Sequence, residues 1–190
     1  MLDLYSRYVV GWMLAPTENG VLAGELIDEA CAKQRIAPGA LTLHNDRGSP
    51  MKARSLAITL AELGVLHSFS RPQVSDDNPF SEAQFKTLKY MPGFPARFAS
   101  LGDARTFLRR FFAWYNDEHR HTGLNLHTPA DVHHGRATAV TAARQVVLDA
   151  ALAAHPDRFV RKAPTAALPP EKAWINPPLD AASPSEVTRA

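Results

Sequence analysis

Two carboxylates, Asp46 and Glu82, stand on separate predicted elements of this 190-residue chain. Asp46 lies in the polar stretch HNDRGSPM directly after the apolar run 40–43, and Glu82 lies on a helix expected after the loop 71–79. Carboxylate oxygens suit Mg²⁺, a hard ion that prefers oxygen ligands and retains waters. Two such ions can promote phosphodiester chemistry, although holding both of them requires several carboxylates.

The same residues also have ordinary structural explanations. An Asn-Asp pair ahead of a glycine is turn-forming chemistry, which would account for Asp46. Glu82 is an acid in a first helical turn, where the helix dipole favours it. Lys86 lies four residues after Glu82, so the two could form an ion pair worth about 0.2–0.5 kcal/mol. Lys89 continues that face and favours a phosphate contact, and the residue types alone leave both explanations open.

Strands and helices alternate at short spacing through the first seventy residues. The segment 8–14, YVVGWML, is β-branched and aromatic, which predicts a strand. The periodicity of 17–35 predicts a helix capped by Thr17 or Asn19. A strand at 41–44, a helix at 52–63 ended by Gly64 and a strand at 65–69 follow. This order favours an α/β sandwich with a partly parallel sheet.

The remaining chain is predicted to be helical before it becomes rich in proline. A helix should begin at Asn78 or Ser81 and stop before Pro92. The segment 103–116 predicts an amphipathic helix whose aromatic face covers the sheet. We therefore expect a core domain over 1–135, a helical extension over 136–162 and a flexible Pro/Ala-rich tail over 163–190.

Composition excludes some classes of protein and permits others. The single cysteine, Cys31, rules out an intrachain disulfide and favours a reducing compartment, so cytoplasm is expected. The N-terminus lacks a signal-peptide pattern and no apolar run suggests a membrane span, so no membrane partner is expected. The net charge is only +2, but residues 83–121 carry seven bases and three acids, which permits a polyanionic partner.

Four blocks of the sequence carry a resemblance to a known family. They are LDLYSRYVVGW, LHNDRGSPM, DNPFSEAQFKTLK and FFAWYNDEHRHTGLNLHTP. Together they resemble the retroviral-integrase-type catalytic core of insertion-sequence transposases, the DDE enzymes of ribonuclease-H-like fold. The resemblance covers about residues 1–135 and implies a mixed sheet flanked by helices.

The resemblance implies roles for particular residues. Asp46 and Glu82 match the second and third acidic positions of a catalytic site that holds two Mg²⁺ or Mn²⁺ ions, and Lys86 and Lys89 match lysines that contact the transposon end. Asn78 matches the DN pair before the glutamate. The tail residues match the YN, RxH and TP motifs of the family, and Arg120 is expected to contact DNA; these tail residues are Tyr115, Asn116, Arg120, His121, Thr128 and Pro129.

The resemblance also implies a function and a departure from the family pattern. The function is DNA transposition by Mg²⁺-dependent cleavage and strand transfer at transposon ends, carried out by a homo-oligomer on transposon-end and target DNA in the bacterial cytoplasm, associated with the nucleoid when bound. The first catalytic aspartate of the family lies on a strand upstream of the position that Asp3 matches. Because the sequence begins at Met1, we expect a core truncated at its N-terminus, without its first strand and first carboxylate. Asp3 matches a position that is not a metal ligand, so it is not assigned that role.

Three other interpretations are open. The chain could be a non-catalytic DNA-binding or dimerisation fragment that modulates a full-length transposase. It could instead be a nuclease of the ribonuclease H type, which shares the fold. A zinc site is disfavoured because no cysteine pair and no common zinc-ligand spacing accompany the histidines between 119 and 134.

Overall fold

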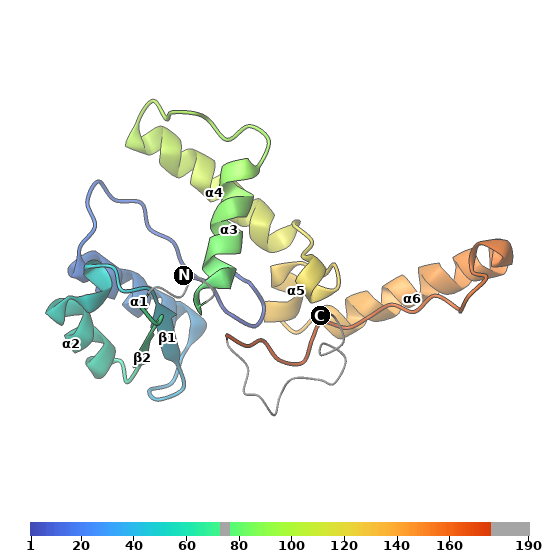
Figure 1. Cartoon of the computed structure of the whole chain (residues 1–190), viewed down its shortest axis with the longest axis horizontal. Helices are drawn as coiled ribbons and strands as arrows, with labels where there is room; N and C mark the ends of the chain where they lie inside the picture. The colour runs from blue at the N-terminus through green and yellow to red at the C-terminus, as the bar shows by residue number, and fades with distance from the viewer. Residues whose placement is uncertain (73–76, 176–190) are drawn as a thin grey trace. The chain divides into compact units, whose positions relative to one another are not determined.

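The computed structural model describes residues 1–72 and 77–175 (Figure 1). Two compact units make up the chain: residues 11–95 form most of one, and residues 1–10 with 96–172 form the other. Part of the predicted 71–79 loop, including Asp76, and residues 176–190 of the predicted flexible tail lie outside the described residues.

The unit around residues 11–95 contains the predicted alternation of strands and helices. Helix α1 spans Gly20–Gln34, and the Asn19 side chain caps it by accepting a hydrogen bond from the Leu22 N–H at 2.9 Å. Strand β1 spans Thr42–Asn45, helix η1 Pro50–Lys52, helix α2 Arg54–Glu62 and strand β2 Leu66–Phe69. Gly64 takes a φ of 63° just after α2, as the helix-ending role of a glycine requires. These predicted elements are confirmed to within a few residues.

Strands β1 and β2 form a parallel pair in which Thr42 is opposite Leu66 and Asn45 is opposite Phe69. Helix α2 makes the crossover between them, as a parallel connection requires. Both strands therefore end at the same edge of the sheet. This edge is followed by Asp46 on one side and by Ser70 on the other.

Helices α1 and α2 pack closely because small residues face each other. A Cβ added at Gly20 would lie 2.3 Å from the Ala53 Cβ, and one added at Gly24 would lie 2.9 Å from the Thr59 Oγ1. Leu56 and Leu60 of α2 are almost fully buried beneath this contact, together with Ile27 of α1. The two glycines thus fix the distance between the helices.

We expect Gly20→Ala to destabilise the protein even though alanine is the better helix former. The methyl group meets another methyl carbon and the Ser55 Oγ at 2.7 Å, and overpacking of this kind costs about 1–3 kcal/mol. Ala32→Gly on the exposed face of α1 is the control, because it measures the difference in helix propensity between alanine and glycine in the same helix, about 1 kcal/mol. Urea unfolding measures both variants, and a Gly20→Ala protein as stable as the parent would contradict the close contact.

Helix α3 spans Pro79–Tyr90 and begins at the Asn78 cap position. Its proline at the first helical position has no N–H to leave unsatisfied, which suits a helix start. Gln84 and Leu88 are its buried residues, so the helix turns one side inward. The predicted start at Asn78 and the stop before Pro92 are confirmed.

The other unit is helical. Helix α4 spans Leu101–Asp117 and is capped by Ser100, whose hydroxyl accepts a hydrogen bond from the Asp103 N–H at 3.0 Å. Phe111 and Tyr115 of α4 are 2% and 1% exposed, which confirms the predicted aromatic buried face. Coverage of the sheet by this helix stays a prediction, because α4 and the sheet belong to different units. The later elements are η3 Thr122–Leu124, α5 Pro129–His133, α6 Ala137–Ala154 and η4 Pro156–Arg158.

The strand predicted over 8–14 is wrong. Among the residues that the structure describes, the segment forms no strand, and Val9 makes an isolated antiparallel bridge with Leu2. The backbone of Val9 is satisfied instead by one side chain, because Asn116 Oδ1 accepts from the Val9 N–H at 2.9 Å and Asn116 Nδ2 donates to the Val9 oxygen at 3.1 Å. A single amide group thus takes the hydrogen bonds that a neighbouring strand would have made.

Helix α6 occupies the alanine-rich stretch where a helical extension was predicted, and the domain boundaries around it stay a prediction. Over its 18 residues the mean hydropathy is 1.2 and no residue is buried, so by length and composition it could cross a membrane. Its own polar contacts tie it to the η3 loop: Arg144 donates to the backbone oxygens of Asn125 and Leu126 at 3.0 and 2.6 Å.

Candidate metal and DNA site

Asp46 is positioned by the end of β1. It is exposed, and its Oδ1 accepts a hydrogen bond from the Gly48 N–H at 3.0 Å, which closes a short turn. The structural explanation of this residue as a turn former is therefore correct. It is compatible with a ligand role, because one hydrogen bond leaves most of the lone pairs of a carboxylate available.

A hydrogen-bond network joins the end of the sheet to the start of α3. His44 on β1 contacts the Ser68 Oγ of β2 through Nδ1 at 3.0 Å and the Asp77 backbone oxygen through Nε2 at 2.9 Å. Ser70 extends the sheet by donating its N–H to the Asn45 oxygen at 2.9 Å. Since Asp77 immediately precedes the Asn78 cap, His44 fastens the N-terminus of α3 to the edge where β1 and β2 end.

An ion pair closes the loop that leads into α3. Asp77 is only 4% exposed in its side chain, and its two oxygens accept from the Arg71 Nε and Nη2 at 2.9 and 2.8 Å. The Arg71 N–H also donates to Asp77, at 2.7 Å. The paired carboxylate raises the pKa of the Arg71 guanidinium. The sequence analysis assigned no role to His44 or Asp77. The signals that could have identified them were their positions, close to Asp46 and directly before Asn78.

Helix α3 carries three of the predicted residues, and Asn78 lies at its N-cap position. Glu82 lies in the first turn and Lys89 in the last. Glu82, Lys86 and Lys89 are all exposed, and none of them makes a side-chain hydrogen bond or ion pair within the described part of the chain. The suggested Glu82–Lys86 ion pair is therefore not formed. Asn78 makes no side-chain capping bond, so its amide is not used to start the helix.

The carboxylate oxygens of Asp46 and Glu82 are of a type that suits a hard cation. Asp46 and Glu82 offer exposed carboxylate oxygens, and both flank the network that joins β1 to α3. Within residues 1–72 and 77–175 no group of three or more His, Cys, Asp or Glu side chains is arranged to hold a metal. Each carboxylate, taken by itself, offers the oxygen donors that Mg²⁺ accepts. Their assignment as catalytic ligands stays a prediction.

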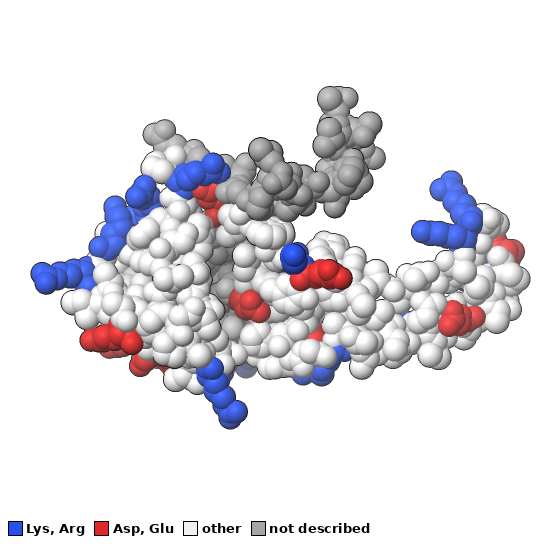
Figure 2. All heavy atoms as spheres, turned by 90° about the horizontal axis from the view of Figure 1, so that it is seen from below, with Lys and Arg blue, Asp and Glu red and all other residues white. Residues whose placement is uncertain are grey.

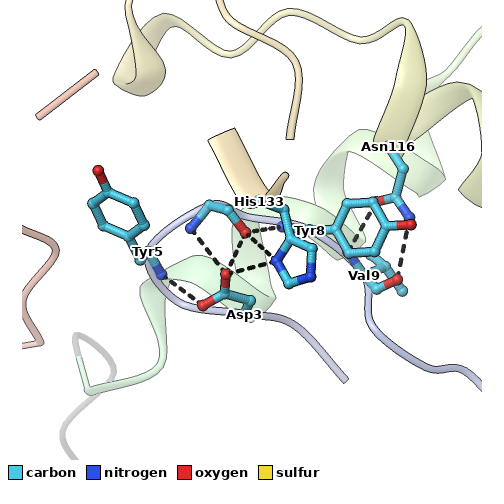
Figure 3. Close-up of polar contacts among 7 residues, drawn as sticks. Asp3, Tyr5, Tyr8, Val9, Asn116 and His133 are labelled. Atoms are coloured by element: carbon cyan, nitrogen blue, oxygen red, sulfur yellow. Dashed lines mark hydrogen bonds and ion pairs between the residues drawn. The ribbon is translucent and has the colours of Figure 1, made fainter. Parts of the chain in front are cut away.

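Asp3 lies in the other unit and makes structural hydrogen bonds there. Its oxygens accept from Ser6 Oγ, from the Tyr5 N–H at 3.2 Å and from His133 Nδ1 at 3.1 Å (Figure 3). Burial would raise the pKa of Asp3, but these hydrogen bonds together bring that pKa below its ordinary value. The Tyr8 ring stacks on His133 with centroids 4.4 Å apart. Asp3 therefore holds a turn against α5, which agrees with leaving it out of the metal site.

The tail motifs have structural roles. Thr128 caps α5 through a capping box with Asp131, and Pro129 opens the same helix. Arg120 is exposed and donates through Nη1 to the Leu126 oxygen at 3.2 Å, so its predicted DNA contact would have to use the remaining donors of the guanidinium. Burial raises the pKa of the Tyr115 hydroxyl. Asn116 holds Val9, as described above.

His121 is the most perturbed histidine of this region. Its Nε2 atom is buried and has no hydrogen-bond partner among the described residues. Burial, reinforced by the charges of His119 and Arg7, lowers the pKa of His121 to about 4. The folded protein therefore keeps this imidazole neutral at pH values where an unfolded histidine takes a proton.

This difference predicts a pH dependence of stability. Between about pH 6.5 and pH 4 the unfolded chain binds a proton at His121 that the folded chain does not, so the free energy of unfolding should fall as pH falls through this window. The loss is on the order of 1–3 kcal/mol. His121→Phe keeps an aromatic ring against Tyr115 and should flatten the profile. Urea unfolding at a series of pH values measures it, and parallel profiles for the two proteins would contradict the assignment.

Two family models, both described as an integrase core domain, match residues 1–75 and 63–129. The transposase for insertion sequence element IS904 of Lactococcus lactis is 30% identical over 131 residues, which is 68% of this chain and 51% of that protein.

Two mycobacterial relatives also carry the name of a transposase. Proteins of Mycobacterium tuberculosis and Mycobacterium bovis, each named as a transposase for insertion sequence element IS986/IS6110, are 31% identical over 122 residues, or 60% of this chain and 43% of each protein. The chain spans about half the length of the curated relatives it matches. The two family models together extend over residues 1–129, the region that the sequence blocks had indicated. The chain belongs to the integrase core family of insertion-sequence transposases and has the ribonuclease-H-like core of that family.

Proposed function

We propose that the chain serves DNA transposition by Mg²⁺-dependent cleavage and strand transfer at transposon ends, in the bacterial cytoplasm. The observation that carries the proposal is the sheet edge where β1 ends, because His44 ties this edge to the start of α3 at 2.9 Å. Asp46 follows the strand, and Glu82 lies in the first turn of the helix whose start His44 contacts. The family membership and the relatives named as transposases support the same function.

In this proposal the residues of the chain have separate roles. Asp46 and Glu82 hold Mg²⁺ or Mn²⁺, two ions in a complete site. Such ions activate an attacking oxygen and neutralise a leaving oxygen in phosphodiester chemistry. Lys86 and Lys89 contact end phosphates, which contributes affinity and register rather than sequence recognition. Asn78 and Arg120 add polar contacts to the DNA, and the assembly on DNA is a homo-oligomer.

A second candidate is a non-catalytic fragment that binds DNA or a full-length transposase and modulates it. It is favoured by the count of acidic ligands, since Asp46 and Glu82 are two carboxylates where a two-ion site needs several. The candidates differ in one measurable property. The first predicts chemistry on DNA, and the second predicts only binding.

The test uses the chain as it is, with labelled DNA carrying the end sequence of the parent element and an unlabelled target duplex. Strand transfer should appear with Mn²⁺ or Mg²⁺ and should be absent with EDTA or Ca²⁺. Joined product supports the catalytic proposal. DNA binding without any joined or nicked product would contradict it and leave the non-catalytic candidate.

A further inference from the structure

Helix α4 presents a face made largely of arginine. The helix turns Ala104, Phe111 and Tyr115 inward, and the residues on its opposite side are exposed. That exposed side contains Arg105, Thr106, Arg109, Arg110 and Ala113, with the exposed acids Asp103 and Asp117 near the two ends of the helix. Because the aromatic face is buried, the helix cannot rotate about its axis to change which residues face solvent. The three arginines, here called the α4 arginine face, are therefore fixed on the surface.

The helix positions that could form ion pairs with this face hold no acidic residue. No Asp or Glu lies three or four residues from any of the three arginines, although those are the positions where helix neighbours form ion pairs. Arg109 and Arg110 form no ion pair within the part of the chain that the structure describes. The nearest acid, Asp103, is used at the helix start, where its Oδ2 accepts from the Ala99 N–H at 3.1 Å.

The arrangement costs stability in the isolated protein. Arg105 and Arg109 are a like-charged pair at i and i+4, which destabilises a helix by about 0.2–0.5 kcal/mol. An anionic partner would relieve this repulsion. Guanidinium groups suit phosphate in particular, because their planar fork can donate two parallel hydrogen bonds.

The spacing suits a repeating anion better than a single one. Arg105 and Arg109 are separated by one turn, about 6 Å along the helix axis. Phosphates on one strand of duplex DNA advance by about 3.4 Å along the duplex axis, so arginines about 6 Å apart span about two phosphate steps. On the side seen in Figure 2, Lys and Arg side chains project from the surface at several places.

We infer that the α4 arginine face binds the phosphate backbone of duplex DNA without reading its sequence, as a contact additional to the α3 lysines. The inference rests on the proposed function for its choice of DNA as the partner. It adds a surface on the unit that lacks the candidate metal site. Sequence-independent contacts of this kind would hold DNA that carries no transposon-end sequence.

The experiment measures the affinity of the chain for a random-sequence duplex by fluorescence anisotropy at several salt concentrations, with EDTA present. The variant carries Arg105→Gln, Arg109→Gln and Arg110→Gln, substitutions that keep a good helix former at each exposed position. We expect binding to weaken at least about tenfold at low salt, and the slope of log K against log salt to fall by about 1 per arginine. The matched control carries Lys33→Gln, Lys162→Gln and Lys172→Gln, which removes the same charge from exposed positions off α4.

A charge-preserving variant, with lysine at all three α4 positions, should retain most of the salt slope. Circular dichroism checks folding, and single variants at Arg109 and Arg110 replace the triple variant if it does not fold. Equal losses in the α4 variant and the lysine control would overturn the inference. Unchanged DNA binding with an altered oligomeric state would also overturn it, since the face would then contact protein. Because EDTA removes any role of the metal, failure of the strand-transfer test leaves this result unaffected.

Discussion

Replacing Glu82 with Gln should reduce metal-dependent strand transfer by more than about 100-fold, the loss that removal of even a supporting residue of a metal site can cause. The amide keeps the size of the side chain but loses the negative charge that a divalent cation requires. Because Glu82 is exposed and makes no side-chain bond within the described residues, the substitution should leave the fold intact. The yield of joined DNA at fixed Mn²⁺ concentration measures the effect.

Asp46→Asn provides the second half of this prediction. An asparagine Oδ1 can still accept the hydrogen bond from the Gly48 N–H, so the turn after β1 should survive while the charge is lost. Both variants should therefore bind DNA like the parent and fail in chemistry. Glu25→Gln, at an exposed position on α1, is the charge-matched control and should keep full activity. Equal activity in all four proteins would remove both residues from the site.

The local parts of the fold could be predicted from the sequence because their causes are local. The cap at Asn19, the glycine that ends α2 and the proline that opens α3 each act within a few residues of their own position. The parallel pair β1–β2 followed from the alternation of strand and helix. The same local signals supported the predictions that Asp46 follows a strand and that Glu82 lies near the start of a helix.

Long-range contacts could not be predicted in this way. Segment 8–14 has the composition of a strand, but the backbone of Val9 pairs with the side chain of Asn116, more than a hundred residues away. The contact between Asp3 and His133 also joins distant parts of the chain and has no periodic signal. Within the candidate site, the His44 contact with the Asp77 backbone depends on loop geometry that side-chain patterns do not report.

The tail motifs show how a resemblance can indicate residues before it explains them. Asn116 and Thr128 were singled out as members of the YN and TP motifs, with no role derived from the sequence itself. In the structure Asn116 pairs with the backbone of Val9, and Thr128 caps α5. These residues support the unit that carries the α4 arginine face, so their substitution should act on folding rather than on a single chemical step.

Asn116→Ala should accordingly be the most destabilising of the substitutions considered. It leaves the N–H and the oxygen of Val9 without partners at a position that is 7% exposed. Each buried group left unsatisfied costs about 1–3 kcal/mol, so the loss for the two groups should be about 2–6 kcal/mol. Urea unfolding monitored by tryptophan fluorescence measures it. Asp117→Ala, at the exposed neighbouring position, should change stability by less than about 0.5 kcal/mol.

Asn116→Asp separates the hydrogen bonds from the volume of the side chain. An ionised carboxylate can accept from the Val9 N–H but cannot donate to the Val9 oxygen, and it buries a charge. A protonated carboxyl group offers one donor and one acceptor, as the amide does. The stability deficit of this variant relative to the parent should therefore shrink as pH is lowered from 7 toward 4. A deficit that stays constant with pH would show that the lost contact is one of packing, and the account of Val9 as a strand paired by one amide side chain would be wrong.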